Sequence, residues 1–471
     1  METLQRAANA GSVSTGFDID NSAAFGGANG IQFNPSSDGN RKTWTVSLWV
    51  KRSEISVETT IFGATNTAMV FMDSDWFRFH LYTGSATYYY DTDNTGTVFR
   101  DTSAWYHLVF QCDTTQAVAA NRTKLYINGA LYTGARGGAD TSANITQNME
   151  FDINDNTQNF NLAYFYAGAE QLDGYLSEVN FTDGVANDAD AFGEYDEDSG
   201  IWKPKAYEGS YGTNGFYLEF KESAGSATGI GLDTSGNGHN FSTGGAYPSQ
   251  STDTPTNNFA TMSPLWKYAT SSTLSNGGTY ISTSTAGWTG AKSSIGVQNG
   301  KWYWEVKSTN VGWSLFPAGI QTANEAYTIS GNAHSQNTTI ALGTGSTYIK
   351  YVAGSESSVS TGGASMDTDN ITGVALDLDS ATKTLKWYRN NSLIGTVNIV
   401  TVSASFGNQL VFPFSSIYAD SGTVFIEYNY GGYTTFSISS AASDANGYGT
   451  FEYAPPSGYY ALCTKNLAEF G

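Results

Sequence analysis

The chain of 471 residues is poor in positive charge: 22 Lys and Arg face 43 Asp and Glu, giving a formal net charge of −21 at pH 7. Affinity for DNA or RNA phosphates comes from Lys and Arg displacing counterions, so this balance argues against a nucleic-acid partner. Charged residues of both signs make up only 14% of the chain, below the roughly 25% of ordinary soluble domains. The polar surface must therefore be mostly uncharged.

Cysteine and histidine are also scarce. Cys112 and Cys463 lie in distant apolar-alternating segments, which favours two small buried side chains over a disulfide framework. The histidines lie in different segments, and no two have a spacing such as H-x-H or H-E-x-x-H. They therefore support neither a zinc site nor a Ser-His-Asp triad. No glycine-rich phosphate-binding motif is present. The four histidines are His80, His107, His239 and His334.

Long apolar runs are missing as well. No window approaches 18 uninterrupted apolar residues, which argues against membrane insertion. The opening METLQRAANAGSVSTG lacks the apolar core of a secretory signal. We therefore expect a protein that is made and kept soluble in a cytoplasm.

Aromatic residues are abundant, at 14% of the chain, and apolar residues recur with period two between Gly, Asn, Asp and Ser clusters. In Trp44 to Lys51, one face carries Trp44, Val46, Leu48 and Val50, and the other is mostly polar. This pattern is typical of a sandwich strand with one solvated side. Asn128-Gly129 and Asn390-Asn391 predict tight hairpin turns. The fold class is therefore predicted as all-β, with two tandem jelly-roll-like β-sandwiches.

The domain organisation follows from where the alternation lapses into Gly, Ser, Thr and Asn. We place a connector between the two sandwiches and an irregular piece at each end. The predicted parts are an N-terminal arm (1–21), a first sandwich (22–220), a connector (221–276), a second sandwich (277–437) and a C-terminal extension (438–471).

Two family resemblances rest on ordered segments. The part between Ser22 and Phe220 resembles the concanavalin A-like jelly roll of laminin G-like and pentraxin-type modules. The segments that carry this resemblance are, in order, WTVSLWVKRS, SAWYHLVFQCD, TKLYINGALYTG and LDGYLSEVNFTDG. The part between Gly277 and Gly431 resembles a SPRY domain. The segments that carry this resemblance are, in order, GKWYWEV, PAGI, GVALDLDSATKTLKWYRNN, VFPFSS and VFIEYNYGG.

The joining pieces suggest a context. Four joining segments are similar to segments of structural proteins from tailed bacteriophages. They are FGEYDEDSGIWKPKAYEGSYGTNGFYLEF, DTSGNGHNF, DTPTNNFATMSPL and YAPPSGYYALCTKNL. The resemblance implies a virion surface protein, a fibre, spike or decoration, that attaches to a host glycan or surface protein and is multimeric in the particle. Without a heptad or triple β-helix repeat, we expect the isolated chain to be a monomer or weakly associated.

The N-terminal arm is expected to dock the chain onto other virion proteins, because it has few apolar anchors of its own. A purely structural capsid or tail decoration without a host ligand stays open as an alternative. A jelly-roll glycan hydrolase is the third reading. Its candidate residues, Glu194, Asp196 and Asp198, would share one strand face. A solvated connector explains them better, so no enzyme activity and no catalytic residue is predicted.

Oxygen-rich loops could hold calcium, since Asp and Asn oxygens are its usual ligands. Plain turn chemistry explains the same residues, and no other cofactor is indicated. In the second sandwich, the loops 321–331, 343–347 and 353–369 are candidates for recognition. The metal candidates are Asp91, Asp93, Asp152, Asn154 and Asp155.

Aromatic side chains in loops are the candidates for sugar binding, because sugars stack their apolar faces on exposed rings. Core and cross-strand packing is the competing explanation for each of them. The predicted ligand-binding residues are Tyr88, Tyr89, Tyr90, Trp288 and Trp313.

Overall fold

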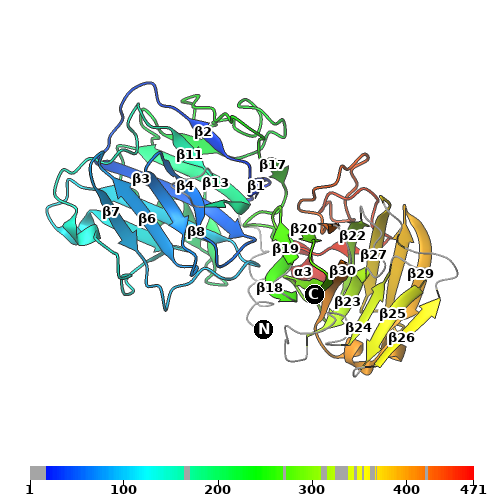
Figure 1. Ribbon diagram of the computed structural model, residues 1–471. Coiled ribbons are helices and arrows are strands. Elements are labelled where there is room, and N and C mark those ends of the chain that lie inside the picture. Colours follow the sequence, from blue (N-terminus) through cyan, green and yellow to red (C-terminus); the bar gives the residue numbers. More distant parts are fainter. Residues whose placement is uncertain are drawn as a thin grey trace. The chain divides into compact units, whose positions relative to one another are not determined.

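The computed structural model describes residues 17–163, 170–268, 272–308, 316–323, 338–343, 347–352, 355–360, 366, 369–419 and 423–471. The chain divides into two compact units, Ser14–Thr256 and Asn257–Gly471, called here the N-terminal unit and the C-terminal unit (Figure 1). Both are built of antiparallel sheets, so the all-β prediction is confirmed.

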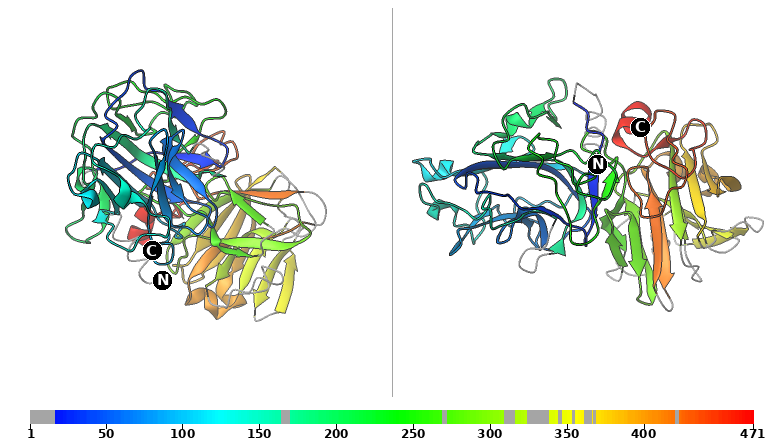
Figure 2. Two further views of the ribbon diagram at one scale, coloured as in Figure 1. Left: turned by 60° about the vertical axis from the view of Figure 1, so that its left-hand side comes forward. Right: turned by 90° about the horizontal axis from the view of Figure 1, so that it is seen from above.

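Two sheets form the N-terminal unit and face each other across its core, as the edge-on view in Figure 2 shows. In order, the described strands of the first sheet are β10 (Ala130–Leu131), β9 (Thr123–Ile127), β8 (Tyr106–Asp113), β3 (Thr43–Arg52), β13 (Asp173–Asp183), β1 (Ser22–Gly26) and β17 (Ser249–Ser251), with β16 (Phe216–Leu218) on β13. Those of the second sheet are β2 (Ile31–Phe33), β11 (Phe160–Leu162), β4 (Thr59–Ala64), β5 (Thr67–Phe71), β6 (Phe77–Tyr82) and β7 (Thr87–Asp91), with β12 (Glu170–Gln171) on β4. A separate hairpin joins β14 (Gly193–Tyr195) to β15 (Trp202–Pro204).

Strand β3 shows the predicted alternation, since Trp44, Val46 and Leu48 are completely buried in the core between the sheets. Its other face was expected to be solvated, and that expectation is wrong. Trp49 stacks on His107 of β8 with ring centroids 4.6 Å apart. The second face is buried because later parts of the chain fold back over it, a contact that the alternation within one strand cannot reveal.

The C-terminal unit is also a pair of sheets around one core. In order, the described strands of its first sheet are β18 (Met262–Tyr268), β21 (Gly287–Ser293), β30 (Val411–Ala419), β23 (Phe316–Thr322), β24 (Thr339–Leu342), β25 (Thr347–Val352) and β26 (Ser355–Ser360). Those of the second are β19 (Ser272–Ser275), β20 (Tyr280–Thr283), β31 (Val424–Asn429), β22 (Lys301–Ser308), β27 (Ile371–Asp377), β28 (Thr384–Arg389) and β29 (Ser392–Asn398), with β32 (Tyr460–Ala461) on β22.

Helical turns are short and few among the described residues. The α-helices are α2 (Ile399–Val402) and α3 (Thr464–Phe470), and the 3-10 turns are η1 (Ala119–Asn121), η2 (Ser142–Asn144), η3 (Ala189–Ala191) and η5 (Ala404–Gly407). No described helix has the length and hydropathy needed to cross a bilayer.

The predicted connector, 221–276, contains ordered strands. Strand β17 pairs with β1 in the N-terminal unit, whereas β18 and β19 belong to the C-terminal unit. Side chains fasten the Gly- and Ser-rich part: Asp233 accepts backbone hydrogen bonds from Tyr217, Ser235 and His239. In the predicted C-terminal extension, β32 pairs with β22. Composition identified these segments as irregular but not their attachment to the sheets.

Candidate functional site

Strand β7 divides the predicted tyrosine triplet between the two faces of its sheet, because successive side chains alternate. Tyr90 is 0% exposed and lies in the core, so it is not available to a sugar. Tyr88 packs against the same core. Tyr89 points to the opposite face and is partly exposed. Of the three, Tyr89 is the one whose side chain lies on the face of the sheet away from the core, and it is the candidate for ligand contact.

Arg78 of β6 connects Tyr89 to a second aromatic ring. Its guanidinium carbon lies 4.5 Å from the ring centroid of Tyr89 and 4.8 Å from that of Trp76. Nε and Nη2 donate to the two carboxylate oxygens of Asp91, each at 2.8 Å. This bidentate pair fixes the plane of the guanidinium. Nη1 makes no hydrogen bond within the described part of the chain, which leaves both of its N–H groups for a ligand.

We call these residues, Trp76, Arg78, Tyr89 and Asp91, the β6–β7 surface. Burial alone would lower the pKa of Arg78, but the hydrogen bonds and charge of Asp91 raise it. Nearby, burial raises the pKa of Glu58, and the charge of Arg78 opposes that shift. The surface therefore combines two partly exposed rings with one fixed cation and an acidic neighbour.

Sequence reasoning found two members of the β6–β7 surface, Tyr89 and Asp91, and missed Trp76 and Arg78. A signal was present: Trp76, Arg78 and His80 alternate with the apolar Phe77, Phe79 and Leu81 of the same strand. What the sequence did not indicate was the register that sets Arg78 opposite Asp91 and His80 opposite Tyr89.

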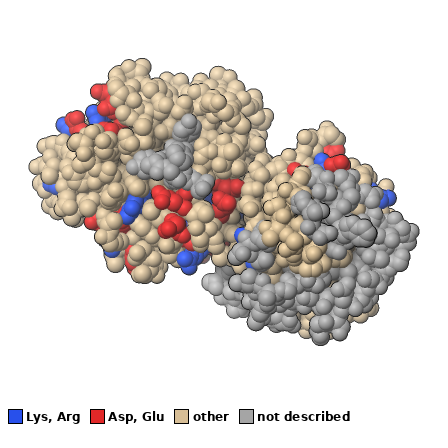
Figure 3. Space-filling model, viewed as in Figure 1, with Lys and Arg blue, Asp and Glu red and all other residues tan. Residues whose placement is uncertain are grey.

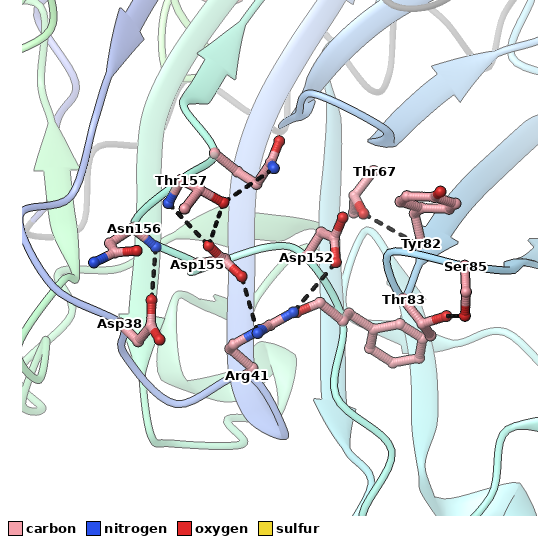
Figure 4. A network of polar contacts seen from close by, with 12 residues as sticks. Asp38, Arg41, Thr67, Tyr82, Thr83, Ser85, Asp152, Asp155, Asn156 and Thr157 are labelled. Carbon is pink, nitrogen blue, oxygen red and sulfur yellow. Dashed lines mark hydrogen bonds and ion pairs between the residues drawn. The ribbon is translucent and has the colours of Figure 1, made fainter.

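The predicted metal loop at Asp152–Asp155 is occupied by a side chain of the protein itself (Figure 4). Arg41 Nη2 lies 3.2 Å from Asp152 Oδ1, and Nη1 lies 2.9 Å from Asp155 Oδ2. Burial is the largest influence on the pKa of Asp152 and raises it, while the charge of Arg41 lowers it. The two carboxylates lie around a guanidinium rather than around an open space for a cation.

Asn154, the third candidate of that loop, is buried and committed to other contacts. Its Nδ2 donates to Asp183 Oδ1 at 2.7 Å, and its Oδ1 accepts from Asn214 Nδ2 at 2.7 Å. Its φ of 67° is the left-handed conformation that Asn tolerates better than most residues. Asn154 thus holds the turn to the rest of the N-terminal unit.

The other two metal candidates, Asp91 and Asp93, each contact a different partner within the protein. Asp91 pairs with Arg78, whereas Asp93 accepts from the backbone amide and hydroxyl of Thr95. Those bonds lower the pKa of Asp93 and form an ordinary Asx turn. Within the described residues, no three or more His, Cys, Asp or Glu side chains are grouped to hold a metal ion.

The acidic cluster weighed as a hydrolase site lies in the β14–β15 hairpin. Asp196 accepts from the backbone amide and hydroxyl of Ser199, and these bonds lower its pKa to about 2. Lys203 lies 3.4 Å from Glu194 and 3.3 Å from Asp196. Each of these two carboxylates is thus held by hairpin contacts.

In the C-terminal unit, Trp288 of β21 belongs to a cluster of partly exposed rings. Its ring centroid lies 6.0 Å from that of Phe316 and 5.3 Å from that of Tyr418. Trp313 lies outside the described residues, as do most residues of the three candidate loops. Trp288 therefore stays a prediction for ligand contact on this unit.

Residues 25–191 match the family model described as the Concanavalin A-like lectin/glucanases superfamily. The match confirms the concanavalin A-like resemblance for this part of the N-terminal unit. No curated protein matches the chain. The virion context of the sequence resemblance stays a prediction.

Solved structures similar to the chain include the SPRY domain of human HERC1, at 13% identity over 36% of this chain and 96% of that chain, with a TM-score of 0.27. A putative carbohydrate binding protein from Bacteroides ovatus matches at 18% identity over 50% of this chain and 61% of that chain, with a TM-score of 0.34. A heptameric SAP-like pentraxin from Limulus polyphemus matches at 16% identity over 36% and 80%, with a TM-score of 0.26.

Proposed function

We propose that the N-terminal unit binds a neutral glycan at the β6–β7 surface, as part of a phage virion protein that attaches to its host. The observation that carries the proposal is the pair of partly exposed rings, Trp76 and Tyr89, beside a fixed Arg78. Flat aromatic faces bind the apolar faces of sugars, and a guanidinium N–H suits a hydroxyl oxygen. The concanavalin A-like lectin/glucanase match of residues 25–191 supports this reading.

The charge of the chain favours a neutral ligand over an acidic one. The net charge is −21, and Asp91 already neutralises the one guanidinium of the β6–β7 surface. On the face drawn in Figure 3, most of the described surface of the N-terminal unit is neither acidic nor basic. An acidic polysaccharide would be repelled by the overall field.

We infer binding without catalysis. Glu194 and Asp196, two of the three carboxylates considered for hydrolysis, are engaged by Lys203 and the hairpin turn. A glycosidase needs one carboxylate to be protonated near neutral pH, and Asp196, with a pKa of about 2, cannot be that acid. Release of reducing ends from a bound polysaccharide would contradict this part of the proposal.

The binding test compares the full-length chain with two variants on a panel of neutral host polysaccharides. Replacing both rings, Trp76→Ala with Tyr89→Ala, is expected to weaken binding at least about tenfold, which corresponds to about 1.4 kcal/mol. The matched control is Tyr195→Ala, because Tyr195 is 51% exposed in the same unit and outside the surface. Equal losses in both variants, or no binding by the unmodified chain, would overturn the proposed site.

The virion part needs its own measurement. The full-length chain, added to host cells before infection, is expected to compete with phage adsorption. The double variant at Trp76 and Tyr89 is expected to compete less. Binding to glycan without competition would separate glycan recognition from host attachment. Incorporation into particles at lattice copy number without any host binding would favour the structural decoration alternative.

A further inference from the structure

One lysine of the N-terminal unit is enclosed against a carboxylate from a distant part of the chain. Lys51 lies on β3, and Asp253 is the second residue after the end of β17. Nζ lies 2.6 Å from Oδ2, and each side chain is only 1% exposed. We propose that Lys51 and Asp253 condense into an intramolecular isopeptide crosslink, an amide between Nζ and Cγ.

Burial prepares the two groups for this reaction. Removing two opposite charges from water is costly, and moving one proton from the ammonium to the carboxylate gives a neutral amine beside a carboxylic acid. Burial lowers the pKa of Lys51, although Asp253 opposes the shift. A neutral amine is the nucleophilic form of lysine. The enclosed site therefore favours the pair of species that can condense.

The surrounding contacts hold the reacting atoms in place. Cγ of Asp253 is bonded to the oxygen that contacts Nζ, and reacting groups held at contact distance gain greatly in rate. Trp105 Nε1 donates to Oδ1 of Asp253 at 3.1 Å, where negative charge develops during attack on Cγ. The ring of Tyr175 lies 5.5 Å from Nζ. The backbone of Asp253 is fixed by Ser22 Oγ, which donates to its carbonyl at 2.6 Å.

The step balances without an oxidant or a cofactor. The lone pair of Nζ forms the new bond to Cγ, and charge passes to Oδ1. A proton from the nitrogen then moves to the hydroxyl group whose oxygen is Oδ2. This group leaves as water, and the C=O bond to Oδ1 forms again. The products are one amide and one water molecule.

Other ion pairs in the described residues lack this combination. Arg52, the residue after Lys51, pairs with Asp75, and these two side chains are equally buried, at 1% and 0% exposure. A guanidinium, however, stays protonated and is not a nucleophile. Lys301 and Asp377 lie 3.0 Å apart with 31% and 7% exposure. Water reaches that lysine, so its ammonium stays charged and the contact stays an ion pair.

The crosslink would join β3, in the middle of the N-terminal unit's first sheet, to the segment that follows β17 at the edge of that sheet. In the strand order, β13 and β1 lie between β3 and β17, and the two residues are 202 positions apart in sequence. Asp253 lies just before the end of the unit at Thr256. An amide there would hold the last segment of the unit on the sheet, just before the chain continues at Asn257.

The test is the mass of the purified full-length chain under denaturing, reducing conditions, with peptide mapping after trypsin. We expect a mass lower than the sequence mass by one water, and one branched peptide that contains Lys51 and Asp253. Lys51→Arg keeps the positive charge but cannot condense in this way, so its mass is expected to equal the sequence mass. The control, Lys301→Arg, is expected to retain the loss of water.

Two outcomes would overturn the proposal. One is a folded wild-type chain whose tryptic map contains separate linear peptides for Lys51 and Asp253. The other is a loss of water that persists in Lys51→Arg, because it would come from a succinimide or another site. Since mapping of the wild type is sufficient, the test stands even where the Lys51→Arg chain does not fold.

Discussion

A single buried carboxylate, Glu305 on β22, fastens the last part of the chain to the C-terminal unit. It is 0% exposed and accepts from the backbone amides of Glu452 and Tyr453 at 3.0 Å and 2.9 Å. Asn429 Nδ2 donates to it at 3.0 Å. Burial raises the pKa of Glu305 to about 7, although these hydrogen bonds act in the opposite direction.

This pKa predicts the direction in which the free energy of unfolding changes with pH. An unfolded Glu ionises near 4.5, whereas folded Glu305 ionises near 7, so the folded state binds more protons between these values. Stability of the C-terminal unit should therefore fall as pH rises through this window. The contribution of this one group is on the order of 3 kcal/mol. Glu305→Gln is expected to lose this dependence in urea unfolding measured across the window.

The control for that measurement is Glu469→Gln, because Glu469 is exposed on α3 of the same unit. Its unfolding free energy should follow the wild-type pH dependence. If Glu305→Gln and the wild type change in parallel with pH, the titration of Glu305 does not govern the stability of this unit.

At the scale of elements, the hairpins follow their turn residues closely. Asn128 and Gly129 have φ of 48° and 81°, and Asn390 and Asn391 have φ of 43° and 66°. Both pairs confirm the predicted turns, since a type I′ turn needs two positive φ values. Asn128 also accepts from the backbone amide of His107 at 2.8 Å, which attaches the turn to β8.

Gly129 allows a prediction that separates backbone strain from crowding. A Cβ at Gly129 would lie 2.2 Å from Cε3 of Trp202, whereas Gly200, with φ of 69°, has nothing within 4 Å of its Cβ position. Gly200→Ala should cost about 1–2 kcal/mol from the left-handed conformation alone. Gly129→Ala should cost about 1–3 kcal/mol more, because Trp202 must move. Urea midpoints measure both, and equal costs would argue against the packing of Trp202 on this turn.

For the whole molecule, the cores of the two units contain different residues. Trp44 contacts Phe79, Phe110 and Phe181 within the N-terminal unit, and Trp304 is buried in the core of the C-terminal unit. Cys112 and Cys463 are buried as free thiols, one in each unit. Each core is therefore expected to respond to its own substitutions.

Trp44→Ala tests this expectation. The loss of a fully buried Trp should cost about 3–5 kcal/mol and raise hydrogen exchange in β3, β8 and β13 of the N-terminal unit. Trp304→Ala, the matched substitution, should raise exchange in β22 and β27 of the C-terminal unit. Exchange measured by mass spectrometry that rises equally in both units for either variant would contradict separate cores.

The sequence by itself determined the all-β class, the main strands and both hairpins, because side-chain alternation and φ preferences are local. It also pointed to Tyr89 and to the loop with Asp152 and Asp155. It did not determine which carboxylate meets which cation. Arg41 reaches Asp152 across 111 positions, and Lys51 reaches Asp253 across 202. Such pairs depend on strand order and on segments that fold over a sheet face, so only the tertiary structure decided them.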